Sequence, residues 1–146
     1  MRTTTRRSIG WRLVEAVCVD PARVHEIWPH VGIRIHESLR RGGDLCDYAT
    51  LRQRVIAGED LLWLALDGKD ILAAAVTSLE LANEKKFCTI VGCAGHDIDR
   101  WRHLIERIEQ FARDENCESV VIQGRRGWAR VLNGYEPVAA ILERKL

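Results

Sequence analysis

The sequence predicts an α/β domain built on a mainly antiparallel sheet, and two patterns carry this prediction. Three strand-like segments follow one another across tight turns, LLWLALDG from Leu61, KDILAAAVTSLEL from Lys69 and FCTIVGCAG from Phe87. The hydrophobic period then becomes helical from Asp97, and a short apolar segment, SVVIQG, follows the helix. An antiparallel meander that leads into a strand–helix–strand crossover is an α/β arrangement. We expect six to seven strands, about four helices and a single domain over residues 1–146.

The first half of the chain predicts one strand and two helices. Residues 12–20 read RLVEAVCVD and form the first strand. Asp20 and Pro21 then supply an N-cap and a proline at the first helical position. Apolar residues at helical spacing continue to Leu39, and Pro29 is expected to kink or split this helix. A second helix covers residues 47–57 and stops at Gly58.

The second half predicts the meander, the long helix and a closing strand. Asp67-Gly68 is a hairpin turn pair, and residues 83–86 form the next turn. In the long helix, from Asp97 to Asn116, one face is apolar and is expected to be buried: Ile98, Trp101, Ile105, Ile108 and Ala112. A short helix at residues 128–132 ends at Asn133-Gly134, and YEPVAAILERKL supplies the last strand.

Composition limits the range of functions. Twenty-two basic and 21 acidic residues give a formal charge of +1, so nothing indicates specific nucleic-acid binding. No apolar run reaches the length of a membrane span, and the basic first ten residues are expected to be flexible. Five cysteines without a CxxC pair indicate reduced thiols in a cytoplasmic protein.

The element order, at this length, resembles the GCN5-related N-acetyltransferase (GNAT) superfamily. The segment GRRGWARVLNGYEPVAAILERKL is similar to the family's last stretch, in which a short helix ends in a Gly-aromatic pair, here Gly134-Tyr135. The hairpin LLWLALDGKDILAAAVTSL is similar to the family's second and third strands. This resemblance implies a parallel strand pair that splays apart and admits the pantetheine arm of acetyl-CoA.

By position, GCAGHDIDRW is the loop that would hold the pyrophosphate of acetyl-CoA in this family. The resemblance implies that the cofactor is bound by Val91, Gly92, Cys93, Gly95, His96, Arg100 and Arg102. The sequence departs from the family pattern, however, because Asp97 and Asp99 stand where a Gly-x-Gly/Ala pattern is usual. Two carboxylates stabilise a helix N-terminus and oppose a pyrophosphate. The simplest interpretation of the loop is therefore a self-capped helix with Asp97 as its cap.

The candidate catalytic residues are His96, Glu80 and Tyr135. Transfer of acetyl to an amine needs a base, and His96 at the mouth of the loop is the best-placed imidazole, with Glu80 and Glu84 as alternatives. Many family members carry a general-acid tyrosine four residues before the Gly-aromatic pair, where this chain has Arg130. Tyr135 lies close by, in a position that is more often part of the core.

Two functions from different classes remain open. One is a divergent acyl-CoA-dependent N-acetyltransferase with an unknown amine substrate. The other is a catalytically inactive protein of the same fold with a protein partner, since the chain is also similar to short acetyltransferase-like proteins of tailed bacteriophages. The histidines and cysteines make poor metal sets, because His25 and His36 are three helical turns apart and Cys88 and Cys93 are expected on opposite strand faces. No metal is expected, and a homo-oligomer is open.

Overall fold

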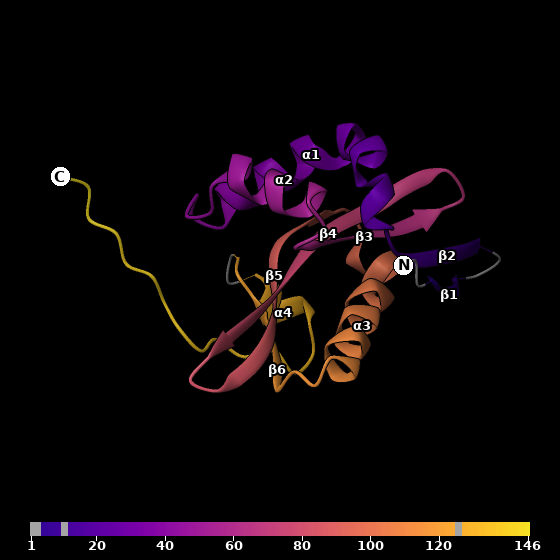
Figure 1. Ribbon diagram of the computed structural model, residues 1–146. Helices are drawn as coiled ribbons and strands as arrows, with labels where there is room; N and C mark the ends of the chain where they lie inside the picture. The colour runs from indigo at the N-terminus through magenta and orange to yellow at the C-terminus, as the bar shows by residue number, and fades with distance from the viewer. Residues whose placement is uncertain (1–3, 10–11, 125–126) are drawn as a thin grey trace.

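The fold is a single six-stranded sheet with helices on both faces (Figure 1). The computed structural model describes residues 4–9, 12–124 and 127–146. The strands lie in sequence order across the sheet, and only the last pair, β5 with β6, is parallel. Their bounds are β1 Thr4–Ile9, β2 Arg12–Cys18, β3 Leu61–Asp67, β4 Asp70–Ala82, β5 Lys85–Gly95 and β6 Ser119–Ile122. The predicted mixed, mainly antiparallel sheet with one parallel pair is confirmed.

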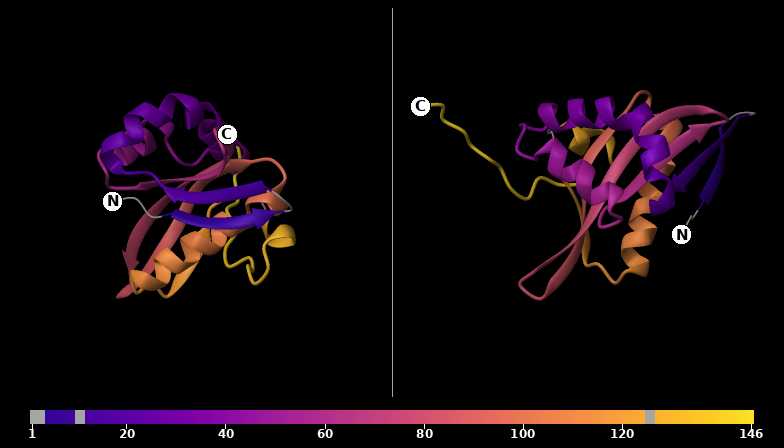
Figure 2. Two further views of the ribbon diagram at one scale, coloured as in Figure 1. Left: turned by 90° about the vertical axis from the view of Figure 1, so that its right-hand side faces the viewer. Right: turned by 45° about the horizontal axis from the view of Figure 1, so that its top comes forward.

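The helices divide the core into two layers (Figures 1 and 2). A short 3-10 turn, η1 (Pro21–Arg23), leads into α1 (Val24–Arg41), and α1 and α2 (Tyr48–Ile56) cover one face of the sheet. On the opposite face lie α3 (Ile98–Asp114) and the short α4 (Trp128–Val131). Alternate residues of the central strands serve the two layers, so Trp63 packs toward α3 and Leu64 toward α1.

Local chemistry sets most of the element boundaries, as the sequence predicts. The Asp20 carboxylate accepts a hydrogen bond from the Ala22 N–H at 3.0 Å, and Asp47 does the same for Thr50. Gly68 turns the β3–β4 hairpin with a φ of 60°. Asn83 and Glu84, with φ of 52° and 64°, form the turn between β4 and β5. Two consecutive left-handed residues are typical of a type I′ hairpin turn.

Pro29 does not split the first helix, and α1 runs through it from Val24 to Arg41. The missing N–H removes one helical hydrogen bond, which by itself favours a break. The helix continues because a buried stripe on both sides of the proline packs on the sheet, including Trp28, Val31 and Ile35. Tertiary packing therefore outweighs the local cost.

The apolar face predicted for α3 is the buried one. Trp101, Ile105, Ile108 and Ala112 are all at most 3% exposed, and Ile98 is half-buried against the same core cluster. Leu104 and His103 are buried as well. Through this wide apolar stripe, α3 packs against all the strands from β1 to β6.

The two ends of the chain compare differently with the sequence prediction. Thr4–Ile9 pairs with β2 as an antiparallel edge strand, where the sequence predicted no strand. At the other end, the predicted last strand is wrong, because residues 136–146 form no strand and are all exposed. A strand needs a neighbour for its backbone groups, and this segment has none in the described chain.

We expect Ile108→Ala to lower the free energy of unfolding by about 2–5 kcal/mol, the usual cost of truncating a buried aliphatic residue. Ile108 is fully buried beneath α3. Gln110→Ala is the matched control, because Gln110 is exposed on the same helix and its side-chain amide donates a hydrogen bond to Asp114 at i+4. Its effect should stay within about 0.5 kcal/mol in urea unfolding. Equal losses would show that another face of α3 is buried.

Candidate functional site

The candidate site lies where β5 and β6 part. The parallel ladder runs from Phe87 opposite Ser119 to Ile90 opposite Ile122. The Gln123 N–H still donates to the Ile90 carbonyl at 3.1 Å, after which β6 has ended and β5 continues to Gly95. Residues 92–95 of β5 therefore pair only with β4 in the described chain. The splayed parallel pair that the resemblance implies is present.

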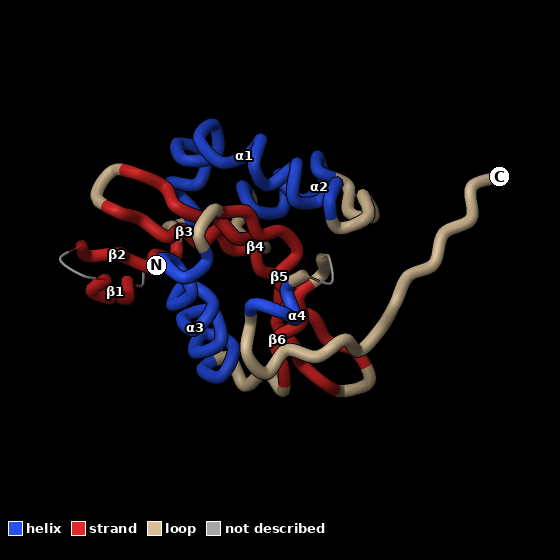
Figure 3. Tube along the Cα trace, turned by 180° about the vertical axis from the view of Figure 1, so that it is seen from behind, coloured by secondary structure: helices blue, strands red, loops and turns tan. Residues whose placement is uncertain are grey.

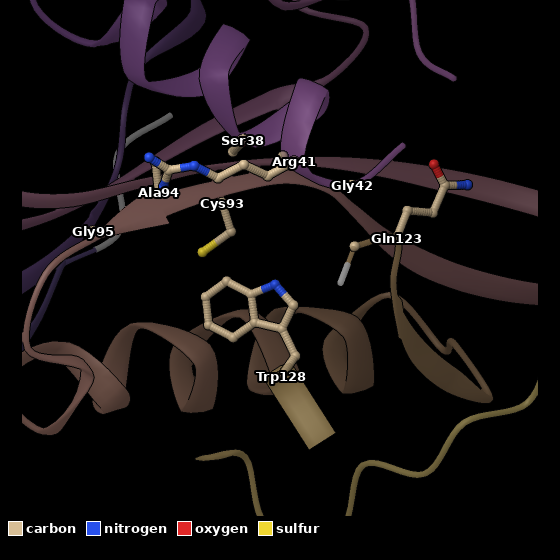
Figure 4. A pocket seen from close by; sticks show the side chains of 10 residues that line it. Ser38, Arg41, Gly42, Cys93, Ala94, Gly95, Gln123 and Trp128 are labelled. Carbon is tan, nitrogen blue, oxygen red and sulfur yellow. The ribbon is translucent and has the colours of Figure 1, made fainter. Parts of the chain in front are cut away.

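A small pocket of about 40 Å³ opens between the parted strands (Figure 4). One wall is the end of β5, Gly92 to Gly95, and the other is Gln123 and Gly124 after β6. The end of α1 forms the roof with Ser38, Arg41 and Gly42, and Trp128 of α4 forms the floor. Of the cofactor-binding residues expected from sequence, the pocket brings together Gly92, Cys93 and Gly95. Val91, His96, Arg100 and Arg102 do not line it.

A β-bulge at Val91 sets which side chains reach the pocket. Ile90 is paired with Thr77 and Gly92 with Val76, so Val91 is an extra residue without an opposite partner. Val91 and Gly92 both face α1 as a result, since Val91 packs in the α1 layer and a Cβ on Gly92 would lie 3.3 Å from Ile35. One inserted residue shifts the alternation of the strand that follows.

The bulge corrects one sequence prediction. Cys88 and Cys93 were expected on opposite faces of their strand, but both pack in the α3 layer of the core. Five residues with simple alternation would separate them, and the extra residue returns Cys93 to the face of Cys88. Burial raises the pKa of Cys93 to about 12. Its thiol, which points toward the Trp128 indole in Figure 4, therefore stays protonated at neutral pH and is a poor nucleophile.

Gly95 is required for close packing at the end of β5. A Cβ at this position would lie 2.7 Å from the Ala73 Cβ and 2.9 Å from the Leu72 carbonyl oxygen. It would also meet the Trp101 indole at 3.0 Å. The glycine thus lets β5, β4 and the first turn of α3 meet at the mouth of the pocket.

The loop after Gly95 differs in one respect from the self-capped helix expected from sequence. Asp97 is the N-cap residue of α3, but its side chain makes no capping hydrogen bond, and its backbone is left-handed with φ 55° and ψ 68°. In that conformation the carboxylate cannot take the usual position over the first turn. The loop is held instead by Trp101, whose indole N–H donates to the His96 carbonyl at 2.9 Å.

The two arginines near the start of α3, Arg100 and Arg102, form ion pairs and do not line the pocket. Arg100 forms an ion pair of 2.7 Å with Asp67 at the β3–β4 turn. Arg102 pairs with Asp99 at 2.8 Å and also donates to the Val131 carbonyl of α4. Both guanidinium groups therefore fix neighbouring elements of the fold.

The three catalytic candidates lie apart from one another. His96 is exposed on the loop beside Gly95. The half-buried Glu80 accepts a hydrogen bond of 2.8 Å from the Thr89 hydroxyl, on the strand face that α1 covers. Tyr135 donates to Glu109 of α3 at 2.7 Å, and burial together with this bond raises its pKa well above the usual value. The Tyr135 phenol is thus held on α3 and is a poor acid for a leaving thiolate.

Sequence reasoning missed the residues that α1 contributes to the pocket. Arg41 lies along the roof, with its guanidinium near Ala94 in Figure 4. The only sequence signal was the Arg40-Arg41-Gly42-Gly43 helix end, which any helix C-terminus can carry. Trp128 was predicted only as part of a short helix, and Arg125 and Arg126 before it lie outside the described residues.

The described residues hold no group of three or more histidine, cysteine or acidic side chains that could bind a metal ion. None of their helices is both long and apolar enough to cross a membrane. The five cysteines are free thiols.

Solved structures of acetyltransferases share this architecture. A GNAT family acetyltransferase from Staphylococcus aureus aligns with a TM-score of 0.60 and 15% identity, over 91% of this chain and 98% of that one. The fold is that of the GNAT acetyltransferases. A predicted acetyltransferase from Clostridium acetobutylicum, solved with acetyl-CoA, aligns with a TM-score of 0.62 and 12% identity over 90% and 96% of the two chains.

A third similar structure is an aminoglycoside acetyltransferase, meta-AAC0020, from an uncultured soil metagenomic sample. It has a TM-score of 0.64 and 13% identity, covering 91% of this chain and 96% of that one. No family model and no curated protein matches the sequence. At these identities the likeness concerns the fold, and the site must be judged by its own residues.

We expect Gly95→Ala to lower the free energy of unfolding by about 1–3 kcal/mol, because the new methyl group has no room between Ala73 and Leu72. Gly127→Ala is the control, since nothing lies within 4 Å of a Cβ there and its φ is −55°. That variant should stay within about 0.5 kcal/mol in the same denaturant titration. A tolerated Gly95→Ala would mean that β5 and β4 are less closely packed than described.

Proposed function

We propose that this chain binds an acyl-coenzyme A between β5 and β6 and transfers its acyl group to an amine. The observation that carries the proposal is the parting of the parallel pair after Ile90, with a pocket at the parting point. The GNAT fold supports it, as does the fold neighbour that was solved with acetyl-CoA. The thioester would supply an activated acyl carbon.

The pantetheine arm fits the backbone that β6 leaves open. Residues 91–95 of β5 have no strand partner on that side in the described chain, so their outward-facing N–H and C=O groups are available. The arm carries two amides, which can form hydrogen bonds with such a strand edge in the manner of an added peptide strand. Because Gly92 and Gly124 have no side chains, α1 packs close to Gly92 and Trp128 packs close to Gly124. The passage between α1 and Trp128 is therefore narrow.

The phosphate end fits less well. Because the Asp97 side chain does not cap α3, the first N–H groups of the helix retain their capacity to bind an anion. The carboxylates of Asp97 and Asp99 oppose a pyrophosphate at the same place, although Asp99 is partly neutralised by Arg102. Arg41 on the pocket roof is the positively charged residue among those that line the pocket in the described chain. We therefore propose a weak cofactor affinity that depends mainly on the pantetheine arm.

For the amine, we propose Glu80 as the base. Its carboxylate is fixed by Thr89, which precedes the bulge at Val91 on the face that α1 covers. A base must be held in place to take a proton from an ammonium group as the nitrogen attacks the thioester carbon. His96, the alternative, is exposed on its loop. The protonated Cys93 thiol makes a covalent acyl-cysteine unfavourable, so we propose direct transfer.

The second candidate is a non-catalytic protein of this fold that binds a partner. Two observations favour it: Arg130 stands where many GNAT enzymes carry a general-acid tyrosine, and the Tyr135 phenol is occupied by Glu109. Coenzyme A thiolate can leave without an acid, so these observations do not exclude transfer. Failure of acyl-CoA binding would favour this candidate.

The next prediction tests the phosphate end of acetyl-CoA separately from its pantetheine arm. In calorimetric titration, Asp97→Asn with Asp99→Asn should tighten acetyl-CoA binding roughly three- to tenfold, because two negative charges leave the helix N-terminus. S-acetylpantetheine lacks the phosphates and serves as the control ligand. Its affinity should be the same for the wild type and the double variant. If neither protein binds either ligand at millimolar concentration, acyl-CoA binding is refuted.

The base prediction compares two glutamates that are close in sequence. With a panel of primary amines and acetyl-CoA, Glu80→Gln should reduce kcat by about 10²–10⁴-fold, the usual contribution of a general base. Glu84→Gln, in the β4–β5 turn, should leave the rate unchanged, and so should His96→Gln. The rate is measured by release of coenzyme A thiol. A larger loss in His96→Gln than in Glu80→Gln would transfer the base role to the loop.

A further inference from the structure

One indole N–H of the described chain is left without an acceptor there, and it belongs to the floor of the pocket. The indoles of Trp28, Trp63 and Trp101 donate hydrogen bonds of 3.0, 2.8 and 2.9 Å to protein oxygen atoms. Trp128 makes no such bond with the described residues, although its side chain is half-buried. An indole N–H that leaves water usually finds a partner. The Trp128 N–H is therefore available to a molecule in the pocket.

The packing around Trp128 turns this N–H toward the closed end of the pocket. A Cβ on Gly124 would lie 3.0 Å from both Nε1 and Cδ1 of the indole, so the nitrogen edge of the ring faces the segment after β6. Gly124 follows Gln123, whose N–H makes the last bond to β5 before the parallel pair parts. Figure 4 shows the ring nitrogen on the side of the indole that faces the strands.

The indole ring is held in place by the protein itself. The short helix α4 lies between α3 and the end of β6 (Figure 3), and Arg102 of α3 donates to the Val131 carbonyl of α4. The Trp101 and Trp128 rings are in edge-to-face contact, with centroids 6.2 Å apart and planes at 75°. Trp101 is itself fixed by its bond to His96. A donor that is already oriented needs no reorganisation when charge develops beside it.

The thioester of the proposed ligand would lie beside this N–H. With its phosphates at the start of α3, after Gly95, the pantetheine arm would follow residues 92–95 of β5 toward the parting point. The sulfur atom at the far end of the arm would then meet Gly92 and Gly124, where the pocket is closed. We propose, on the basis of the acyl transfer proposed above, that the Trp128 indole N–H donates a hydrogen bond to this sulfur and stabilises the thiolate as it leaves.

The transfer then uses groups already described. The Glu80 carboxylate takes a proton from the amine as its nitrogen attacks the acyl carbon, and the C–S bond breaks with its electron pair on sulfur. The indole N–H donates to the sulfur and keeps its proton, since tryptophan is a donor only. The thiolate leaves with its charge and takes a proton from water. A fixed N–H dipole thus takes the place of a general acid, which suits a pocket whose nearby phenol, Tyr135, is bonded to Glu109.

Replacement of Trp128 by 3-benzothienylalanine, in which sulfur stands in place of the indole N–H, removes the donor and keeps the shape of the ring. With acetyl-CoA we expect kcat to fall about 10- to 100-fold, the range for one hydrogen bond to a charged group. With the acetyl selenoester of coenzyme A the loss should be at most about threefold, because a selenolate is a weaker base and needs less stabilisation.

Trp28→Phe is the matched control, because it removes an indole N–H that bonds Tyr48 on the far side of α1 from the sheet. The ratio of its rates with the two acetyl donors should equal that of the wild type. Equal losses with the two donors in the benzothienylalanine variant, or no loss with acetyl-CoA, would overturn the role of Trp128.

The thiol pKa of bound coenzyme A gives a second test that needs no turnover. It is followed by the ultraviolet absorbance of the thiolate in the saturated complex, with the desulfo-coenzyme A complex as the blank. We expect this pKa to be about one unit higher in the benzothienylalanine variant than in the wild type, because the thiolate has lost its donor. Equal pKa values would overturn the proposal.

The two tests also separate this proposal from the proposed function. A wild-type protein that binds coenzyme A without turnover would refute acyl transfer, and the thiol pKa would still decide whether Trp128 bonds the sulfur. A wild-type protein that binds neither acetyl-CoA nor coenzyme A at millimolar concentration would refute both.

Discussion

The site depends on the single extra residue that β5 carries at Val91. From Phe87 to Ile90 the strand is paired on both sides, with β4 and with β6. At the bulge the alternation shifts, so that Gly92 turns toward α1 and Cys93 toward α3. Bulges bend a strand and increase its twist. That local change coincides with the point where β6 ends its pairing and the pocket begins.

The glycines around the pocket determine how narrow it is. A Cβ on Gly42, at the end of α1, would lie 3.3 Å from the Gly124 Cα after β6, and a Cβ on Gly124 would lie 3.0 Å from Trp128. The end of α1 and the segment after β6 therefore approach each other above the parted strands. An occupant must be a slender chain that uses backbone hydrogen bonds, since bulky groups find no space.

Local signals in the sequence predicted most of the helices and strands. The site, in contrast, is formed by contacts between residues that are far apart in the sequence. The cap at Asp20 and the turn at Gly68 could be predicted because a cap or turn depends on adjacent residues. The bulge could not, because Val91 stands in a run of residues that all favour strands and its extra place appears only against β4. Arg41 was missed for the same reason, since only the packing of α1 on β5 brings it to the pocket.

The C-terminal segment also shows that a local sequence pattern is not enough to form a strand. Its apolar pattern predicted a strand, and the pattern is real, but strand formation requires hydrogen-bond partners that the segment lacks within the described chain. β6 is four residues long and pairs with β5 alone in the described chain. Its end at Ile122 therefore decides where the parallel pair parts, and the residues that follow it, Gln123 and Gly124, line the pocket.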